Sequence, residues 1–148
     1  MHDSAEQIFA DIAAHPTHQN GRLLVFAIRR MAVGGLHDAH ATHAVLAHFG
    51  LGYRRPLILM RAMMAEIARA SQQTIKIAPC CCLRMTGDEA ALLQVIEQAC
   101  GNPHGAHAML QQLMGTDACL GVLTTAQAVA QAFHDLGRPL ALFGTRSG

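Results

Sequence analysis

The chain of 148 residues has no tryptophan, one tyrosine and five phenylalanines, and only 14% of its residues are charged. It therefore lacks the interleaved aromatic side chains on which single-stranded nucleic acids stack. Its isoelectric point of about 7.8 also lies below the basic range typical of nucleic-acid-binding domains. We do not expect nucleic acid to be a partner.

Long apolar runs and a cationic start are also missing. No run reaches the roughly 18 residues that indicate a membrane span. The segment MHDSAEQIFADIAAH carries Asp3, Glu6 and Asp11 but no Lys or Arg, unlike a secretory signal peptide. Five cysteines, an odd number, without such a signal predict reduced thiols instead of a disulfide framework. We expect a cytoplasmic protein without a membrane span.

Motifs that identify an enzyme are absent as well. The chain has no Gly-rich phosphate loop, no G-x-S-x-G turn, no H-E-x-x-H pair and no E-x-x-H ligand pattern. These absences favour a protein that is not an enzyme, and they leave no activity to assign from motifs.

Helical periodicity is what the sequence does contain. In the segment 55–71, Leu57, Met60, Met64 and Ile67 recur every three or four residues and predict one apolar helix face. Gly34-Gly35 either kinks a helix or ends it. The same reasoning predicts helices over 22–33, 36–49, 55–71, 90–99, 104–114 and 124–137.

Capping residues mark several of these ends. Asn20 is expected to cap the first helix, and Thr86 with Glu89 has the spacing of a capping box. Thr124 or Thr125 is expected to cap the last helix. We predict one mainly all-α domain over residues 1–148, with five to six helices and at most one short strand pair, from the segments 74–78 and 139–143.

The cysteines at 80–82 leave several interpretations open. They fill the core, act as a nucleophile, or form a soft-metal or redox site in which Cys80 and Cys82 point the same way from an extended segment. Cys100, Cys119 or the helical pair His37 and His40 would complete a zinc or copper(I) site. A second helical pair, His104 and His107, has the same spacing. Paired C-x-x-C knuckles, the strong sign of zinc, are absent.

Charge is distributed unevenly along the chain. Residues 22–65 hold six arginines against one acid, whereas residues 85–137 hold five acids and no Lys or Arg. Such blocks pair within one fold, across a homo-oligomer or with an anionic partner. We expect a homo-oligomer, and take as candidate anion or partner contacts Arg54, Arg55 and Arg61.

Three segments together resemble a family of small bacterial proteins known only as a domain of unknown function: AIRRMAVGGLHDAH (27–40), YRRPLILMRAMMAEIAR (53–69) and APCCCLRMTGDEAALL (78–93). The resemblance implies a single helical domain and carries no residue roles. Our first functional prediction is a binding or interaction module that is not an enzyme. The alternatives are a metal or thiol-redox protein using Cys80 and Cys82, and a small enzyme with an anion-binding arginine pocket.

Overall fold

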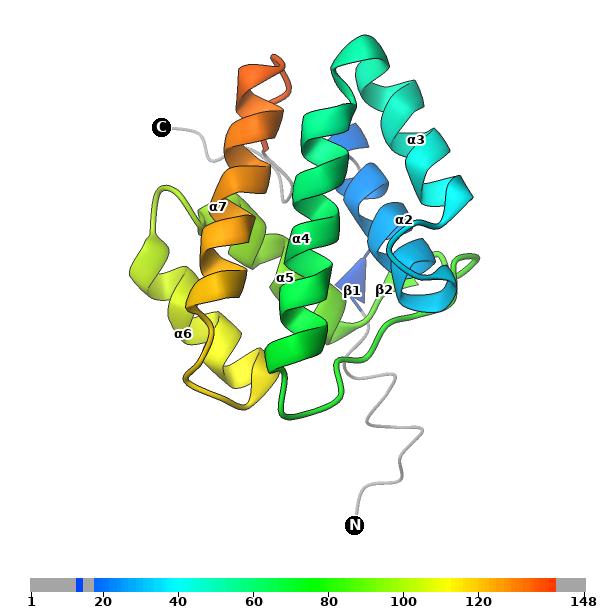
Figure 1. The fold of residues 1–148 in the computed structure, drawn as a ribbon. Coiled ribbons are helices and arrows are strands. Elements are labelled where there is room, and N and C mark those ends of the chain that lie inside the picture. Colours follow the sequence, from blue (N-terminus) through cyan, green and yellow to red (C-terminus); the bar gives the residue numbers. More distant parts are fainter. Residues whose placement is uncertain (1–12, 15–17, 141–148) are drawn as a thin grey trace.

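The computed structural model describes residues 13–14 and 18–140, and these residues contain six α-helices, so the prediction of a mainly helical chain is confirmed (Figure 1). Residues 1–12 and 15 of the N-terminal segment that underlies the expected location, and residues 141–143 of the second expected strand, lie outside the described part. The helices are α2 (Gln19–Gly34), α3 (Ala39–Phe49), α4 (Arg54–Ala70), α5 (Gly87–Gln98), α6 (Pro103–Met114) and α7 (Leu120–Asp135), and a 3-10 turn, η1 (Gly50–Gly52), joins α3 to α4.

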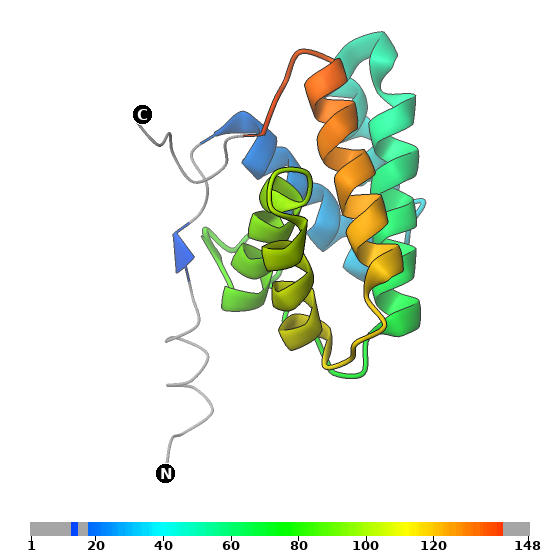
Figure 2. The ribbon, with the colours of Figure 1, turned by 90° about the vertical axis from the view of Figure 1, so that its left-hand side faces the viewer.

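The helices form two layers. In Figure 1, α4 lies between α7 and α3, and α4 packs along most of its length on α7. The side view in Figure 2 shows this layer at the right, with α2 and α5 to its left. Helix α6 packs on α5 and α7. Helix α2 contacts both α3 and α5, so it connects the front layer to the part of the chain that carries the cysteines.

The glycine pair ends a helix instead of kinking it. Gly35 has a φ of +95° and Gly50 has a φ of +65°, values that residues with a Cβ atom rarely adopt. Each of these glycines follows the last residue of a helix. Asp38 then begins α3 by accepting a hydrogen bond from the Ala41 amide at 3.0 Å.

The prediction that Asn20 caps the first helix is wrong. His18, not Asn20, precedes α2, and its Nδ1 accepts from the Asn20 amide at 3.2 Å. Asn20 is instead buried and uses its side chain for contacts elsewhere in the fold. The capping box of Thr86 and Glu89 is confirmed at the start of α5.

The expected cap of the last helix is also wrong. Helix α7 begins at Leu120 after Cys119, which places Thr124 and Thr125 inside it. Their hydroxyl groups donate to the carbonyls four residues earlier, 2.6 Å to Leu120 and 2.9 Å to Gly121. A threonine hydroxyl satisfied in this way does not need a helix end.

The strand pair lies elsewhere than expected. The described residues pair β1 (Ala13–Ala14) with β2 (Arg84–Met85) in antiparallel register. The segment 74–78 is irregular, because its backbone groups bond to side chains at the start of α5: the Lys76 amide donates to Asp88 Oδ2 at 2.7 Å.

A single apolar core joins the helices. Leu24, Met60, Leu93 and Phe133 are fully buried in it, so Met60 of the predicted apolar face of α4 is part of this core. Met63, which the sequence pattern did not select, is buried more deeply than its neighbour Met64. No helix among the described residues has the length and apolar character needed to cross a membrane.

Candidate functional site

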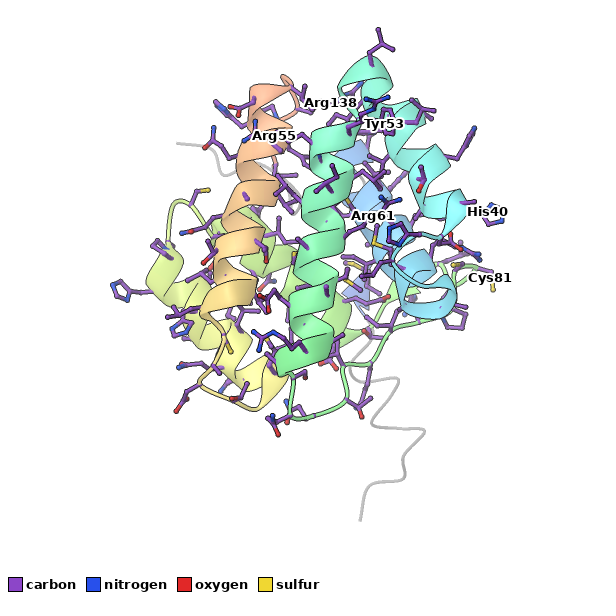
Figure 3. All side chains as sticks on the ribbon, in the orientation of Figure 1. His40, Tyr53, Arg55, Arg61, Cys81 and Arg138 are labelled. Carbon is purple, nitrogen blue, oxygen red and sulfur yellow. The ribbon has the colours of Figure 1, made fainter. Side chains whose placement is uncertain are left out.

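The three consecutive cysteines form a tight turn and not the extended segment that the sequence suggested. The Cys82 amide donates to the Pro79 carbonyl at 3.0 Å, which closes a four-residue β-turn. Cys80 and Cys82 are half-buried, whereas Cys81 is exposed and points outward (Figure 3). We call residues 79–83 the cysteine turn.

A buried arginine of α2 holds this turn in place. Arg29 is only 1% exposed. Its Nη1 donates to the Cys82 carbonyl and its Nη2 to the Arg84 carbonyl, each at 2.8 Å. Its Nε and Nη2 also form a two-bond ion pair with Glu89 at 2.8 and 2.9 Å. One side chain therefore fixes two carbonyls of the loop that leads into α5.

Glu89 holds the same segment from the other side, and we call the Arg29–Glu89 ion pair, with the backbone hydrogen bonds of both side chains, the brace. Its carboxylate also accepts from the Thr86 amide at 2.9 Å and from the Ala78 amide at 3.2 Å. These bonds tie both ends of the segment 78–86 to the first turn of α5. The hydrogen bond to Glu89 is the main cause of the raised pKa of Arg29, which stays charged despite its burial.

Two hollows flank the cysteine turn, and Cys82 lines both. The first, of about 580 Å³, lies between α2 and the turn and is lined by Phe26 and Leu83. The second, of about 650 Å³, is lined by Val33 and Ile77 on the other side of the turn. Leu83 is 85% exposed and Val33 is 73% exposed, so the rims carry large apolar side chains in contact with water.

Cationic side chains surround the hollows. Arg22 lines the first, and Lys76 and Arg84 line the second. Close by, Arg30 binds Asp38 through two hydrogen bonds of 3.0 and 2.9 Å, and this pairing lowers the pKa of Asp38 to about 2.

Arg30 also faces the cysteine turn. Its pKa is raised first by the hydrogen bonds to Asp38 and next by its contact with the Cys80 side chain. Two arginines of α2, Arg29 and Arg30, thus border the thiols.

The other two predicted cysteine ligands lie elsewhere. Cys100 is exposed beyond α5, with its Sγ 3.6 Å from the Gln127 carbonyl. Cys119 is buried before α7 and donates to the Thr116 carbonyl at 3.1 Å. Burial and then the charge of Asp117 raise the pKa of the Cys119 thiol. Neither residue has the surroundings of a shared metal site.

The predicted histidine ligands do not complete a site either. His37 and His40 are exposed where α3 begins, and His40 points outward (Figure 3). His104 and His107 belong to α6, at the opposite side of the molecule in Figure 1. Across residues 13–14 and 18–140, no group of three or more His, Cys, Asp or Glu side chains has the geometry to hold a metal ion. The site of three or four ligands suggested by the sequence is therefore not assembled within the described chain.

The three candidate arginines of α4 do not form one pocket. Arg55 lies at the end where α4 begins and pairs with Asp135 of α7 at 2.8 Å, whereas Arg61 lies farther along α4 (Figure 3). Arg61 donates to the Leu36 carbonyl at 2.9 Å and to Thr42 Oγ1 at 3.0 Å. Arg54 is exposed. Arg55 and Arg29 thus each pair an arginine of the basic segment 22–65 with an acid of the segment 85–137 within one chain.

Sequence reasoning missed the role of the brace. The signal was available in part, because Arg29 follows buried Ile28 and lies four residues after buried Val25 on the helix. A charged residue at an apolar position of a helix needs a buried partner. The capping box identified Glu89 as a local helix cap but gave no reason to pair it with a residue 60 positions away.

A second missed cluster joins the start of α2 to the segment after α7. Asn20 Nδ2 donates to the carbonyls of Arg138 and Pro139 at 2.9 and 3.1 Å, and its Oδ1 lies 2.7 Å from His48 Nε2. Burial, followed by the charge of Arg138, lowers the pKa of His48. All these groups have partners, which favours a structural role for the cluster.

Comparisons with known proteins identify a family and no activity. A family profile described as "Family of unknown function (DUF6628)" matches residues 1–142. No curated protein matches the chain, and no solved structure does.

Proposed function

The chain belongs to the DUF6628 family, and we propose that it is a binding module, not an enzyme, whose recognition surface is the cysteine turn with its two flanking hollows. The observation that carries this proposal is the buried brace of Arg29 and Glu89 beneath an exposed apolar turn. A loop fixed in this way needs little further ordering when a ligand binds, which lowers the entropic cost of association.

The exposure of Leu83 and Val33 supports the same conclusion. Single exposed apolar residues are common on protein surfaces, but here one such residue lines each of two neighbouring hollows, which gives a surface suited to contact. Burying one leucine side chain contributes roughly 1.5–3 kcal/mol. The buried charge of Arg29 is used to hold the backbone of this patch, not the core of the helix layers.

The charges around the patch define the ligand that fits it. Arg22, Lys76 and Arg84 line hollows whose walls are otherwise mainly apolar. A partner with an apolar centre and acidic edges complements this surface, because opposite charges at a rim favour approach and orientation. We therefore propose a protein partner that presents apolar side chains flanked by carboxylates.

Octanoate and octylamine test this preference with one apolar chain and two opposite head-group charges. We expect octanoate to shift the backbone amide NMR signals of Phe26, Leu83 and Ile77 at lower concentration than octylamine does. Equal shifts with both probes, or shifts spread over the whole molecule, would contradict the proposed surface.

Matched surface variants complete the test. Leu83→Ser combined with Val33→Ser should weaken octanoate binding at least fivefold while leaving the urea midpoint nearly unchanged, because both side chains are exposed. Leu51→Ser is the control, since Leu51 is 99% exposed but lies on η1, away from the cysteine turn. An equal loss in the control would refute the assignment.

Self-association and a cytoplasmic location stay predictions. A homo-oligomer would bury exposed apolar side chains near the start of α4, such as Leu51 of η1 and Ile58 of α4. Sedimentation equilibrium tests it: Ile58→Lys should convert a dimer to a monomer, and a wild-type monomer at all concentrations would end this prediction.

A further inference from the structure

The cysteine turn has the features of a soft-metal site with two protein ligands. Cys80, Cys81 and Cys82 all line the hollow of about 580 Å³, yet no third His, Cys, Asp or Glu ligand converges with any pair of such residues in the described chain. Zinc in proteins is held by three or four ligands, so these residues do not fit it. Copper(I) is a soft ion that prefers thiolates and is stable with two of them.

Cys80 and Cys82 are the better pair of sulfurs. Both are half-buried beside apolar side chains, whereas Cys81 is exposed and points outward (Figure 3). The Cys82 amide donates to the Pro79 carbonyl and so closes the turn that carries both residues, and Arg29 fixes the Cys82 carbonyl. The pair is therefore held on a backbone that the brace orders before any ligand arrives.

The charges next to the pair suit an anionic complex. Two thiolates and one copper(I) ion carry a net charge of −1. Arg22 and Arg29 line the same hollow as the three cysteines, which places cationic side chains beside the proposed complex.

We propose that Cys80 and Cys82 bind one copper(I) ion as a two-coordinate bis-thiolate. Each S–H bond breaks, two Cu–S bonds form, two protons pass to the solvent and no electron is transferred. This inference rests on the proposed function only in placing the ligand at the cysteine-turn surface.

Competition with the coloured chelator bicinchoninate tests the proposal on the reduced full chain under anaerobic conditions. The wild-type protein should withdraw one equivalent of copper(I). Cys80→Ser and Cys82→Ser should each lower the affinity at least tenfold, and Cys81→Ser and Cys100→Ser should change it less than threefold. No withdrawal by the wild type, or an equal loss in Cys81→Ser or Cys100→Ser, would overturn the proposal.

A measurement on the wild type guards against variants that fail to fold. Copper(I) should protect Cys80 and Cys82 from iodoacetamide, read by peptide mass spectrometry, while exposed Cys100 reacts as before. Unprotected Cys80 and Cys82 would again refute the site. Octanoate shifts without copper(I) uptake would refute this site alone, and copper(I) uptake without octanoate shifts would refute the proposed apolar recognition alone.

Discussion

Glu89→Gln is the substitution that should destabilise this fold most per atom changed. The side chain keeps its shape but loses its charge, and the Arg29 guanidinium then stays buried without a counter-charge. Both carboxylate oxygens also accept hydrogen bonds from backbone amides, those of Thr86 and Ala78. After the substitution, the side-chain NH₂ group would face a backbone N–H donor at either position and could not accept its hydrogen bond.

The expected cost follows from these contacts. Removing one partner of a buried ion pair typically costs 3–5 kcal/mol, because the remaining charge is uncompensated. We expect about 4 kcal/mol for Glu89→Gln, a large part of the roughly 5–15 kcal/mol that stabilises a domain. With a urea slope of about 2 kcal/mol/M, the midpoint should fall by about 2 M.

Urea unfolding followed by far-UV circular dichroism, in reductant, measures this cost. Glu66→Gln is the matched control, because the Glu66–Arg69 pair lies three residues apart on the surface of α4 and should contribute less than about 1 kcal/mol. Hydrogen exchange should show the amides of Ala78 and Thr86 opening in Glu89→Gln. A cost below about 1 kcal/mol, or one equal to that of Glu66→Gln, would refute the view that the brace holds the cysteine turn.

Three further predictions use titration and reactivity. The lowered pKa of His48 means that the unfolded chain binds the proton more readily, so stability should fall as the pH drops below about 6.5; urea midpoints should lose this slope in His48→Gln. Beside Arg30 the pKa of Asp38 is lowered to about 2 in the folded chain, compared with 3.8 in the unfolded chain. This difference stabilises the fold above pH 4, and the stabilisation is lost as the pH falls from 4 to 2. Asp38→Asn should flatten that part of the acid-unfolding curve. Cys119, buried and with a raised thiol pKa, should alkylate only after unfolding, whereas exposed Cys81 reacts in the native protein; mass spectrometry of native samples that shows the reverse order would contradict the structure.

Local sequence signals were enough to predict the helices. The apolar stripe of α4 was read from Leu57, Met60 and Ile67, and the start of α5 from its capping box. Glycine with positive φ at the ends of α2 and α3 belongs to the same class of signal. These features depend on residues within about four positions of one another, and the sequence displays such spacings directly.

Caps with competing partners were predicted less well. Asn20 and Thr124 are good capping residues by type, but Asn20 serves carbonyls 118 and 119 positions away and the Thr124 hydroxyl bonds inside its helix. Residue type shows that a side chain seeks a partner, and it does not show which partner lies in reach.

The sequence by itself determined that the chain is helical, where its helices lie and where they end to within two residues, and that residues 80–82 place three thiols together. Only the tertiary structure decided what surrounds those thiols. It brought Arg29 of α2 against Glu89 of α5, turned Cys81 outward, and left Cys100, Cys119, His37 and His40 without a common centre. The reason is physical: a buried charge must find its counter-charge wherever the packing of whole helices places it, and no local spacing encodes that distance.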